Sequence, residues 1–177
     1  MKIIAYVLNI SGLVCLLVAS LIKGEKMKKT LFLVLCGNLL TAIGYLCGGN
    51  AVNGSISCFL GTAQTAINYL FDSKNKPIPK WLVGLYALSF IGVNIWIGGV
   101  TFLSILTILA CMTFIMGILQ KSGTGYRIWT ILNCVLWSAY DIFSRSYNGL
   151  IAHLTVLIFS VAGMIINDRK NKKEVLE

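Results

Sequence analysis

Residues 74–80 read Lys-Asn-Lys-Pro-Ile-Pro-Lys and interrupt a chain that is otherwise largely apolar. They hold both prolines of the 177-residue sequence. Three long apolar segments precede this stretch and four follow it, at residues 3–22, 30–47, 51–71, 81–97, 100–119, 126–143 and 148–166. Each is close to the roughly 20 residues with which a helix crosses the hydrocarbon core of a membrane. The sequence therefore predicts an all-α integral membrane protein with seven transmembrane helices.

The composition favours the same class of protein. Hydrophobic residues make up 57% of the chain and charged residues 12%, and the mean hydropathy is +0.82. Soluble domains carry about 25% charged residues, so this chain has too few to cover its surface in water. The seven segments also leave no room for a separate soluble domain.

The Lys and Arg residues predict the orientation. With seven spans, all 15 of them except Lys2 and Arg145 fall on the side that holds the C-terminus, namely Lys23, Lys26, Lys28, Lys29, Lys74, Lys76, Lys80, Lys121, Arg127, Arg169, Lys170, Lys172 and Lys173. Cytoplasmic loops carry such an excess, so we expect the N-terminus outside and the C-terminus inside. The net charge of +9 then indicates contact with anionic membrane lipids and no nucleic-acid partner, because the basic residues form no surface interleaved with aromatic residues.

The proline-containing stretch divides the predicted spans into three, one and three. Residues 1–76 form a first three-helix repeat, residues 77–97 a linker and an inversion helix, and residues 98–177 a second three-helix repeat with a basic cytoplasmic tail. A single helix between two three-helix units gives both units the same orientation in the membrane. Parallel repeats of this kind are typical of secondary transporters, whose substrate site lies near the midplane where the repeats meet.

Polar residues fall into register when the second unit is laid on the first. Asn38 then meets Asn133, and Tyr45 meets Tyr140. Both asparagines lie near the middle of their spans, where an unpaired polar group costs free energy. They are candidates for binding a solute, although hydrogen bonds that only hold helices together, worth about 0.6 kcal/mol each, explain them equally well.

The sixth span carries the clearest polar and aromatic stripe. Asn133, Trp137, Tyr140 and Asp141 recur at helical spacing and share one face. Trp137 is buried in mid-span, whereas the other tryptophans fall at span ends. Gln64 and Asn68 lie one turn apart in the third span, nearer the cytoplasmic side, and we expect them in the inner part of the same path.

Two ionisable residues stand out in the last two spans. Asp141 precedes Arg145 by four positions, a spacing that predicts a surface ion pair. His153 is either a site residue or a structural histidine. These two, His153 and Asp141, are the candidates for proton coupling. The cysteines form no C-x-x-C pair, so no metal, disulfide or cofactor is predicted, and no motif of an intramembrane enzyme is present.

The second half of the chain combines Arg127, Trp137, Tyr140, the turn Tyr147-Asn148-Gly149 and His153. With these residues it resembles the YgjV family of bacterial inner membrane proteins. The three-one-three arrangement also looks like that of the SWEET sugar transporters and the PnuC vitamin transporters. The SWEET resemblance implies that His153, sixteen positions after Trp137, faces it across the pocket. No proline occurs in residues 3–22 or 100–119, unlike the first helix of SWEET repeats.

We therefore expect a facilitator in the bacterial inner membrane that moves a small polar, ring-containing solute of the sugar, nucleoside or vitamin class. The pocket would use Asn38, Asn133, Trp137 and His153. Alternating access between the two repeats would carry the solute, and a homo-oligomer is compatible with this function. The alternative is a non-transporting membrane protein that binds a protein or lipid partner. A wide cavity between the second, third, sixth and seventh spans would argue against this alternative.

Overall fold

The computed structural model describes residues 2–22, 27–48, 52–145 and 147–168. Within these residues the chain is helical and has no strand. The helices are α1 (Lys2–Leu21), α2 (Met27–Gly48), α3 (Val52–Ser73), α4 (Lys80–Gly98), α5 (Phe102–Ile118), α6 (Gly123–Ser144) and α7 (Tyr147–Gly163), followed by a π-helical turn at Met164–Asp168. Each predicted apolar segment thus forms one helix, which confirms the all-α prediction.

The helix ends differ from the predicted ends by a few residues, and polar caps fix the starts of α5 and α6. Ser122 precedes α6, and its hydroxyl accepts a hydrogen bond from the Gly125 amide at 3.1 Å. Thr101 caps α5 by accepting from the Ser104 amide at 3.2 Å. Such side chains satisfy amides that have no partner inside the helix. Hydropathy alone does not predict where these capped helices begin.

Four helices of the described residues are long and apolar enough to cross a membrane, with windows at Ile3–Leu21, Met27–Gly44, Lys80–Gly98 and Gly149–Ile166. Helix α5 is apolar but shorter. Large apolar side chains are exposed on the outside of the bundle, whereas Gln64, Asn68 and Arg127 are buried. A soluble protein shows the opposite distribution. The fold therefore suits a lipid surrounding.

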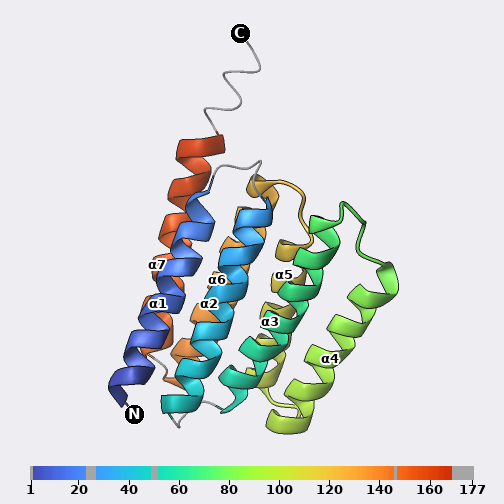
Figure 1. Ribbon diagram of the computed structural model, residues 1–177. Coiled ribbons are helices and arrows are strands. Elements are labelled where there is room, and N and C mark those ends of the chain that lie inside the picture. The colour runs from blue at the N-terminus through green and yellow to red at the C-terminus, as the bar shows by residue number, and fades with distance from the viewer. Residues whose placement is uncertain (1, 23–26, 49–51, 146, 169–177) are drawn as a thin grey trace.

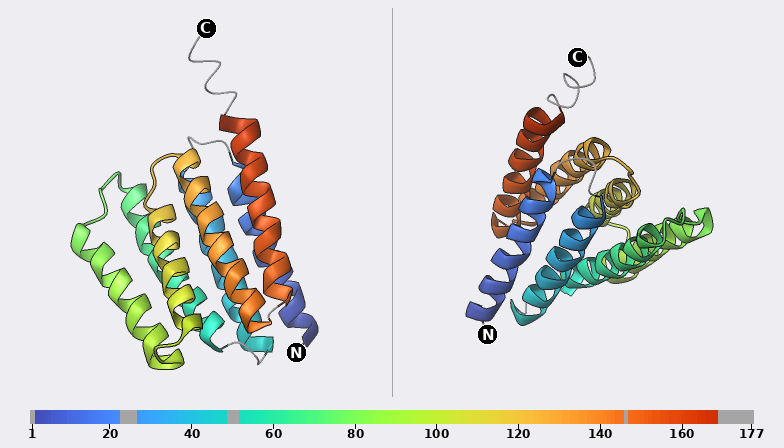
Figure 2. Two further views of the ribbon diagram at one scale, coloured as in Figure 1. Left: turned by 180° about the vertical axis from the view of Figure 1, so that it is seen from behind. Right: turned by 45° about the horizontal axis from the view of Figure 1, so that its top comes forward.

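The helices form two layers (Figures 1 and 2). Helices α1, α2 and α3 lie side by side in one layer, and α7, α6 and α5 lie in the other. Helix α1 packs against α7 at one edge, and α4 packs against α3 and α5 at the other. Helices that follow one another in the sequence thus pack against one another, and the contact between α1 and α7 closes them into a ring.

Small residues allow α1 and α2 to approach closely. A Cβ atom on Gly12 would lie 2.5 Å from the Thr41 hydroxyl and 2.9 Å from the Gly37 carbonyl oxygen. A Cβ atom on Gly44 would collide with the amide of Asn9. Small residues commonly line such contacts in membrane proteins, because dispersion forces and hydrogen bonds hold the helices together there.

Arg127 connects the two layers at the end of the bundle where α1 ends. Its side chain is 1% exposed, its Nε donates to the Ser20 carbonyl at 2.9 Å, and its Nη2 donates to the Ile22 carbonyl. Gly163 of α7 leaves the necessary space, since a Cβ there would lie 2.6 Å from the Ser20 oxygen. A cation at a helix C-terminus satisfies unpaired carbonyls and complements the helix dipole.

Candidate functional site

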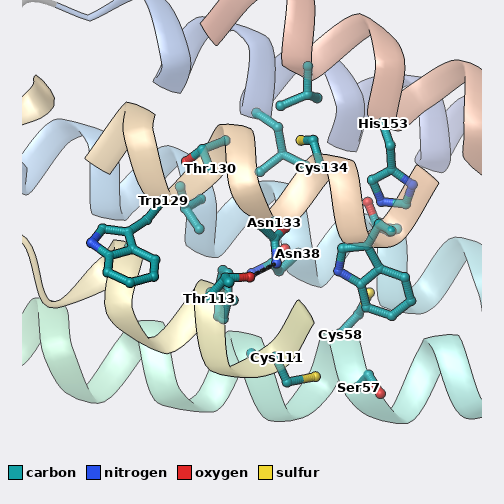
Figure 3. A pocket seen from close by; sticks show the side chains of 18 of the residues that line it. Asn38, Ser57, Cys58, Cys111, Thr113, Trp129, Thr130, Asn133, Cys134 and His153 are labelled. Atoms are coloured by element: carbon teal, nitrogen blue, oxygen red, sulfur yellow. Dashed lines mark hydrogen bonds between the residues drawn. The ribbon is translucent and has the colours of Figure 1, made fainter. Parts of the chain in front are cut away.

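A cavity of about 170 Å³ lies inside the ring. All seven helices contribute to its wall, which combines amides, hydroxyls and aromatic rings (Figure 3). Its polar lining residues are Asn38, Thr41, Ser57, Thr113, Thr130, Asn133 and His153, and its aromatic ones are Phe90, Phe114, Tyr126, Trp129 and Trp137. A cavity with both kinds of surface can hold a small solute and fix its orientation.

Four of the predicted site residues meet at this cavity. Asn38 comes from α2, Asn133 and Trp137 from α6, and His153 from α7. Residues from α3 complete the wall opposite them, among them Ser57 and Cys58 (Figure 3). The cavity thus lies between the second, third, sixth and seventh helices, where the carrier hypothesis requires one, and α1, α4 and α5 contribute as well.

Two asparagines at the cavity have different surroundings. The Asn133 amide nitrogen donates to the Ala110 carbonyl at 2.6 Å and to the Thr113 hydroxyl at 3.2 Å, both on α5. The Asn38 amide makes no hydrogen bond to any described residue. Asn133 therefore holds α5 against α6 with its nitrogen and offers its oxygen to the cavity, whereas the whole Asn38 amide is available to a solute.

Gly61 of α3 sets the width of the cavity beside Asn38. A Cβ atom at this position would lie 3.4 Å from the Asn38 amide nitrogen and 3.3 Å from the ring of Phe114. Any larger residue would push against both groups. Gly61 therefore keeps the Asn38 amide accessible from inside the ring.

His153 forms a cluster with two residues of α6. Its Nδ1 lies 2.7 Å from an Asp141 carboxylate oxygen, and its ring stacks on Trp137 with a centroid distance of 5.6 Å and an interplanar angle of 9°. Tyr140 packs edge-on against Trp137 at 5.3 Å and is not among the lining residues. Tyr140 therefore supports the indole from behind the wall.

The predicted ion pair between Asp141 and Arg145 is wrong. The Asp141 side chain is 5% exposed and bonds to His153, whereas Arg145 is exposed and ends α6 in a left-handed conformation with φ 57°. The four-residue spacing brings side chains together only while the helix continues, and α6 ends at Ser144. Gly149 gives Asp141 its space, since a Cβ there would lie 2.6 Å from the carboxylate.

Gln64 and Asn68 are not among the residues that line the cavity. They continue the α3 stripe of Cys58 and Gly61 toward the cytoplasmic side of the predicted topology, and both are buried. The Asn68 oxygen accepts a bond from the Tyr86 hydroxyl at 3.2 Å. The Asn68 nitrogen and both polar atoms of Gln64 are buried without a hydrogen-bond partner among the described residues. Tyr45 lies on α2, but its side chain is outside the described residues.

Several lining residues carried no clear signal in the sequence. The hydroxyls of Thr113 and Thr130 donate to carbonyls of their own helices at 2.7 and 2.8 Å, so threonine is tolerated in any apolar helix. Trp129 lies near the end of its predicted span, yet it lines the cavity. Its position between Tyr126 and Asn133 on the α6 stripe was the only signal for it.

His153 is the one ionisable His, Lys, Arg, Asp or Glu side chain among the described lining residues of the cavity. No Lys, Arg, Asp or Glu side chain in the described part of the chain lines the cavity, and Asp141 contacts His153 from outside the lining. Among the described residues no group of three His, Cys, Asp or Glu could hold a metal ion. An ionic solute would find no opposite charge in this cavity, so its wall suits an uncharged one.

Comparison with known proteins identifies no relative of this chain. No family model, no curated protein and no solved structure matches the chain. The resemblance to the YgjV, SWEET and PnuC groups therefore stays a prediction from the sequence, and the function has to be argued from the cavity.

Proposed function

We propose that this protein is a membrane facilitator for a small, polar, ring-containing solute. The observation that carries the proposal is the cavity of about 170 Å³ inside a ring of helices whose outer surface is apolar. A polar interior is expensive to bury in a membrane and usually marks a solute path. Asn38, Asn133, Trp137 and His153 are the proposed contacts.

The proposed topology has seven spans in a bacterial inner membrane, with the N-terminus outside and the C-terminus inside. In support, the described helices run alternately up and down (Figure 1), so the exposed lysines Lys28, Lys29, Lys74, Lys76 and Lys121 share one end of the bundle. Four of the seven helices meet the length and hydropathy criteria for a span among the described residues. Helices α3, α5 and α6 do not, and each of them contributes polar side chains to the cavity, namely Ser57, Thr113, Thr130 and Asn133.

Alternating access would follow from two facing units. Helices α1, α2 and α3 pack in chain order, as do α5, α6 and α7, and the cavity lies between these two rows. Rocking of one row against the other would open the cavity first to one side and then to the other. Since the lining has no charged pair for an ion, we propose uniport, with His153 and Asp141 as the candidates if a proton is coupled.

One observation favours the alternative, a non-transporting protein that binds a protein or lipid partner. The Asn133 amide nitrogen bonds to backbone and hydroxyl oxygens of α5, as a purely structural asparagine would. The alternative does not explain Asn38, whose amide lies at the cavity without a described partner. We therefore rank it second.

Uptake into proteoliposomes tests the proposal. Purified protein should accelerate entry of at least one solute from a panel of single-ring bases, sugars, nucleosides and vitamins. Trp137→Ala and Asn38→Ala should reduce this uptake about tenfold or more, the factor expected for losing one good contact. Thr155→Val serves as control, because Thr155 bonds within α7 and is not among the lining residues. Folded protein that moves no solute of the panel would refute the proposal.

A further inference from the structure

We infer that the cavity selects an uncharged, planar, single-ring heteroaromatic molecule that carries both amide-type donors and acceptors, such as a pyrimidine base. This inference rests on the proposed function and narrows its substrate class. Three properties of the cavity carry it: its volume, its aromatic wall and its few open hydrogen-bonding groups.

The volume limits the solute to one ring. An apolar protein cavity of about 150 Å³ takes one benzene molecule, and this cavity has about 170 Å³. A base with an attached ribose or a disaccharide would require the ring of helices to widen. Helices α1 and α2 already pack closely, since a Cβ atom on Gly12 would lie 2.5 Å from the Thr41 hydroxyl and 2.9 Å from the Gly37 carbonyl oxygen.

The wall favours a flat aromatic solute over a sugar. Aromatic rings from three helices line the cavity, namely Phe90 of α4, Phe114 of α5, and Trp129 and Trp137 of α6. The His153 ring already covers one face of the Trp137 indole. A solute ring would therefore also pack against the other three aromatic side chains. Aromatic rings pair with one another by stacking or edge contacts that add to area burial.

The polar groups are few and neutral. Asn38 offers a complete amide with a donor and an acceptor, and Asn133 offers an oxygen after its nitrogen has bonded to α5. An amide edge of a heterocycle matches an asparagine amide atom for atom. A hexose brings five hydroxyls, and each would need a partner at a wall where the threonines Thr113 and Thr130 already donate to their own helices.

Charge excludes the ionic relatives of such a base. The part of the lining that the structure describes holds no Lys, Arg, Asp or Glu, and the Nδ1 atom of His153 already faces Asp141 at 2.7 Å. A carboxylate attached to the same ring would therefore be buried without a cationic partner, which is costly in a low-dielectric site.

Four matched probes test the inference. Uracil has the inferred ring; orotate adds a carboxylate, uridine adds a ribose, and glucose replaces the aromatic ring by a saturated one. Binding to purified wild-type protein in nanodiscs is measured by calorimetry. We expect uracil to bind at least tenfold more tightly than the other three, and Asn38→Leu to weaken uracil binding about tenfold, whereas Thr155→Val leaves it unchanged.

The native cysteines give a second readout that needs no variant. Cys58, Cys111 and Cys134 line the cavity, whereas Cys36 does not. Uracil should slow the reaction of the first three thiols with N-ethylmaleimide and leave the rate at Cys36 unchanged. Tighter binding of glucose, uridine or orotate, or no protection by uracil, would overturn the inference. Uracil binding without uptake into proteoliposomes would instead refute the proposed function and uphold the site.

Discussion

Single side chains decide what the cavity can hold, and small residues beside them decide where these side chains lie. Asp141 lies beside His153 only because Gly149 has no side chain. His153 in turn stacks on Trp137. A change at Gly149, which does not line the cavity, should therefore reach the cavity wall through two neighbours.

Gly149→Ala should destabilise the protein and disturb the His153 cluster. The new Cβ would lie 2.6 Å from the Asp141 carboxylate, so the carboxylate must move, and overpacking of this kind costs about 1–3 kcal/mol. Gly84→Ala is the matched control, because a Cβ there meets nothing within 4 Å and alanine favours a helix by about 1 kcal/mol. Thermal unfolding in detergent should show a lower Tm for the first variant and an unchanged or higher Tm for the second. Equal shifts would contradict the contact.

Gln64→Leu should stabilise the protein and reduce its transport. Both polar atoms of this amide are buried without a described partner, and such a group costs about 1–3 kcal/mol. Leucine has nearly the same shape and removes this cost. If the α3 stripe forms the inner part of the solute path, uptake should fall although Tm rises. A lower Tm would show that the amide is satisfied in the folded protein.

At the level of elements, Arg127 joins the end of α1 to the start of α6. We expect Arg127→Met to cost about 3 kcal/mol, since it removes bonds from a charged donor to two carbonyls, each worth about 1.5–3 kcal/mol. Lysine should not restore the loss, because it lacks the planar fork. Lys121→Met removes the same charge from an exposed position and should cost less than about 0.5 kcal/mol. Unfolding measurements compare the three variants. Similar losses of stability for Arg127→Met and Lys121→Met would contradict a stabilising role of the bonds from Arg127 to the end of α1.

The elements themselves were predictable because a membrane imposes a length on apolar segments. Asn38, Asn133 and Trp137 were also predictable, since polar groups in mid-span are costly and therefore conspicuous. The bond between Asp141 and His153 was not, because twelve residues and a turn separate them. The spacing of four residues predicted Arg145 as the partner of Asp141 instead. The burial of Arg127 depends on the end of α1, which no pattern near Arg127 reveals.

At the scale of the whole molecule, the ring of helices places polar groups inside and apolar groups outside. The two rows α1 to α3 and α5 to α7 enclose the cavity. Cys58 of α3 lines it, so the reactivity of this thiol measures access to the cavity. If the rows rock, a thiol at this position should become accessible from each side of the membrane in turn. If the interior is permanently shut, the thiol should stay unreactive from both.

The most direct measurement is therefore the sidedness of Cys58 labelling. A variant that keeps Cys58 and has serine at the other five cysteine positions is reconstituted and exposed to a membrane-impermeant thiol reagent from outside and, separately, from inside. A matched variant that keeps only Cys36, which does not line the cavity, is the control. We predict labelling of Cys58 from both sides, slowed by a bound solute, and no such protection at Cys36. Labelling of Cys58 from neither side, or from one side only, would contradict alternating access through this cavity.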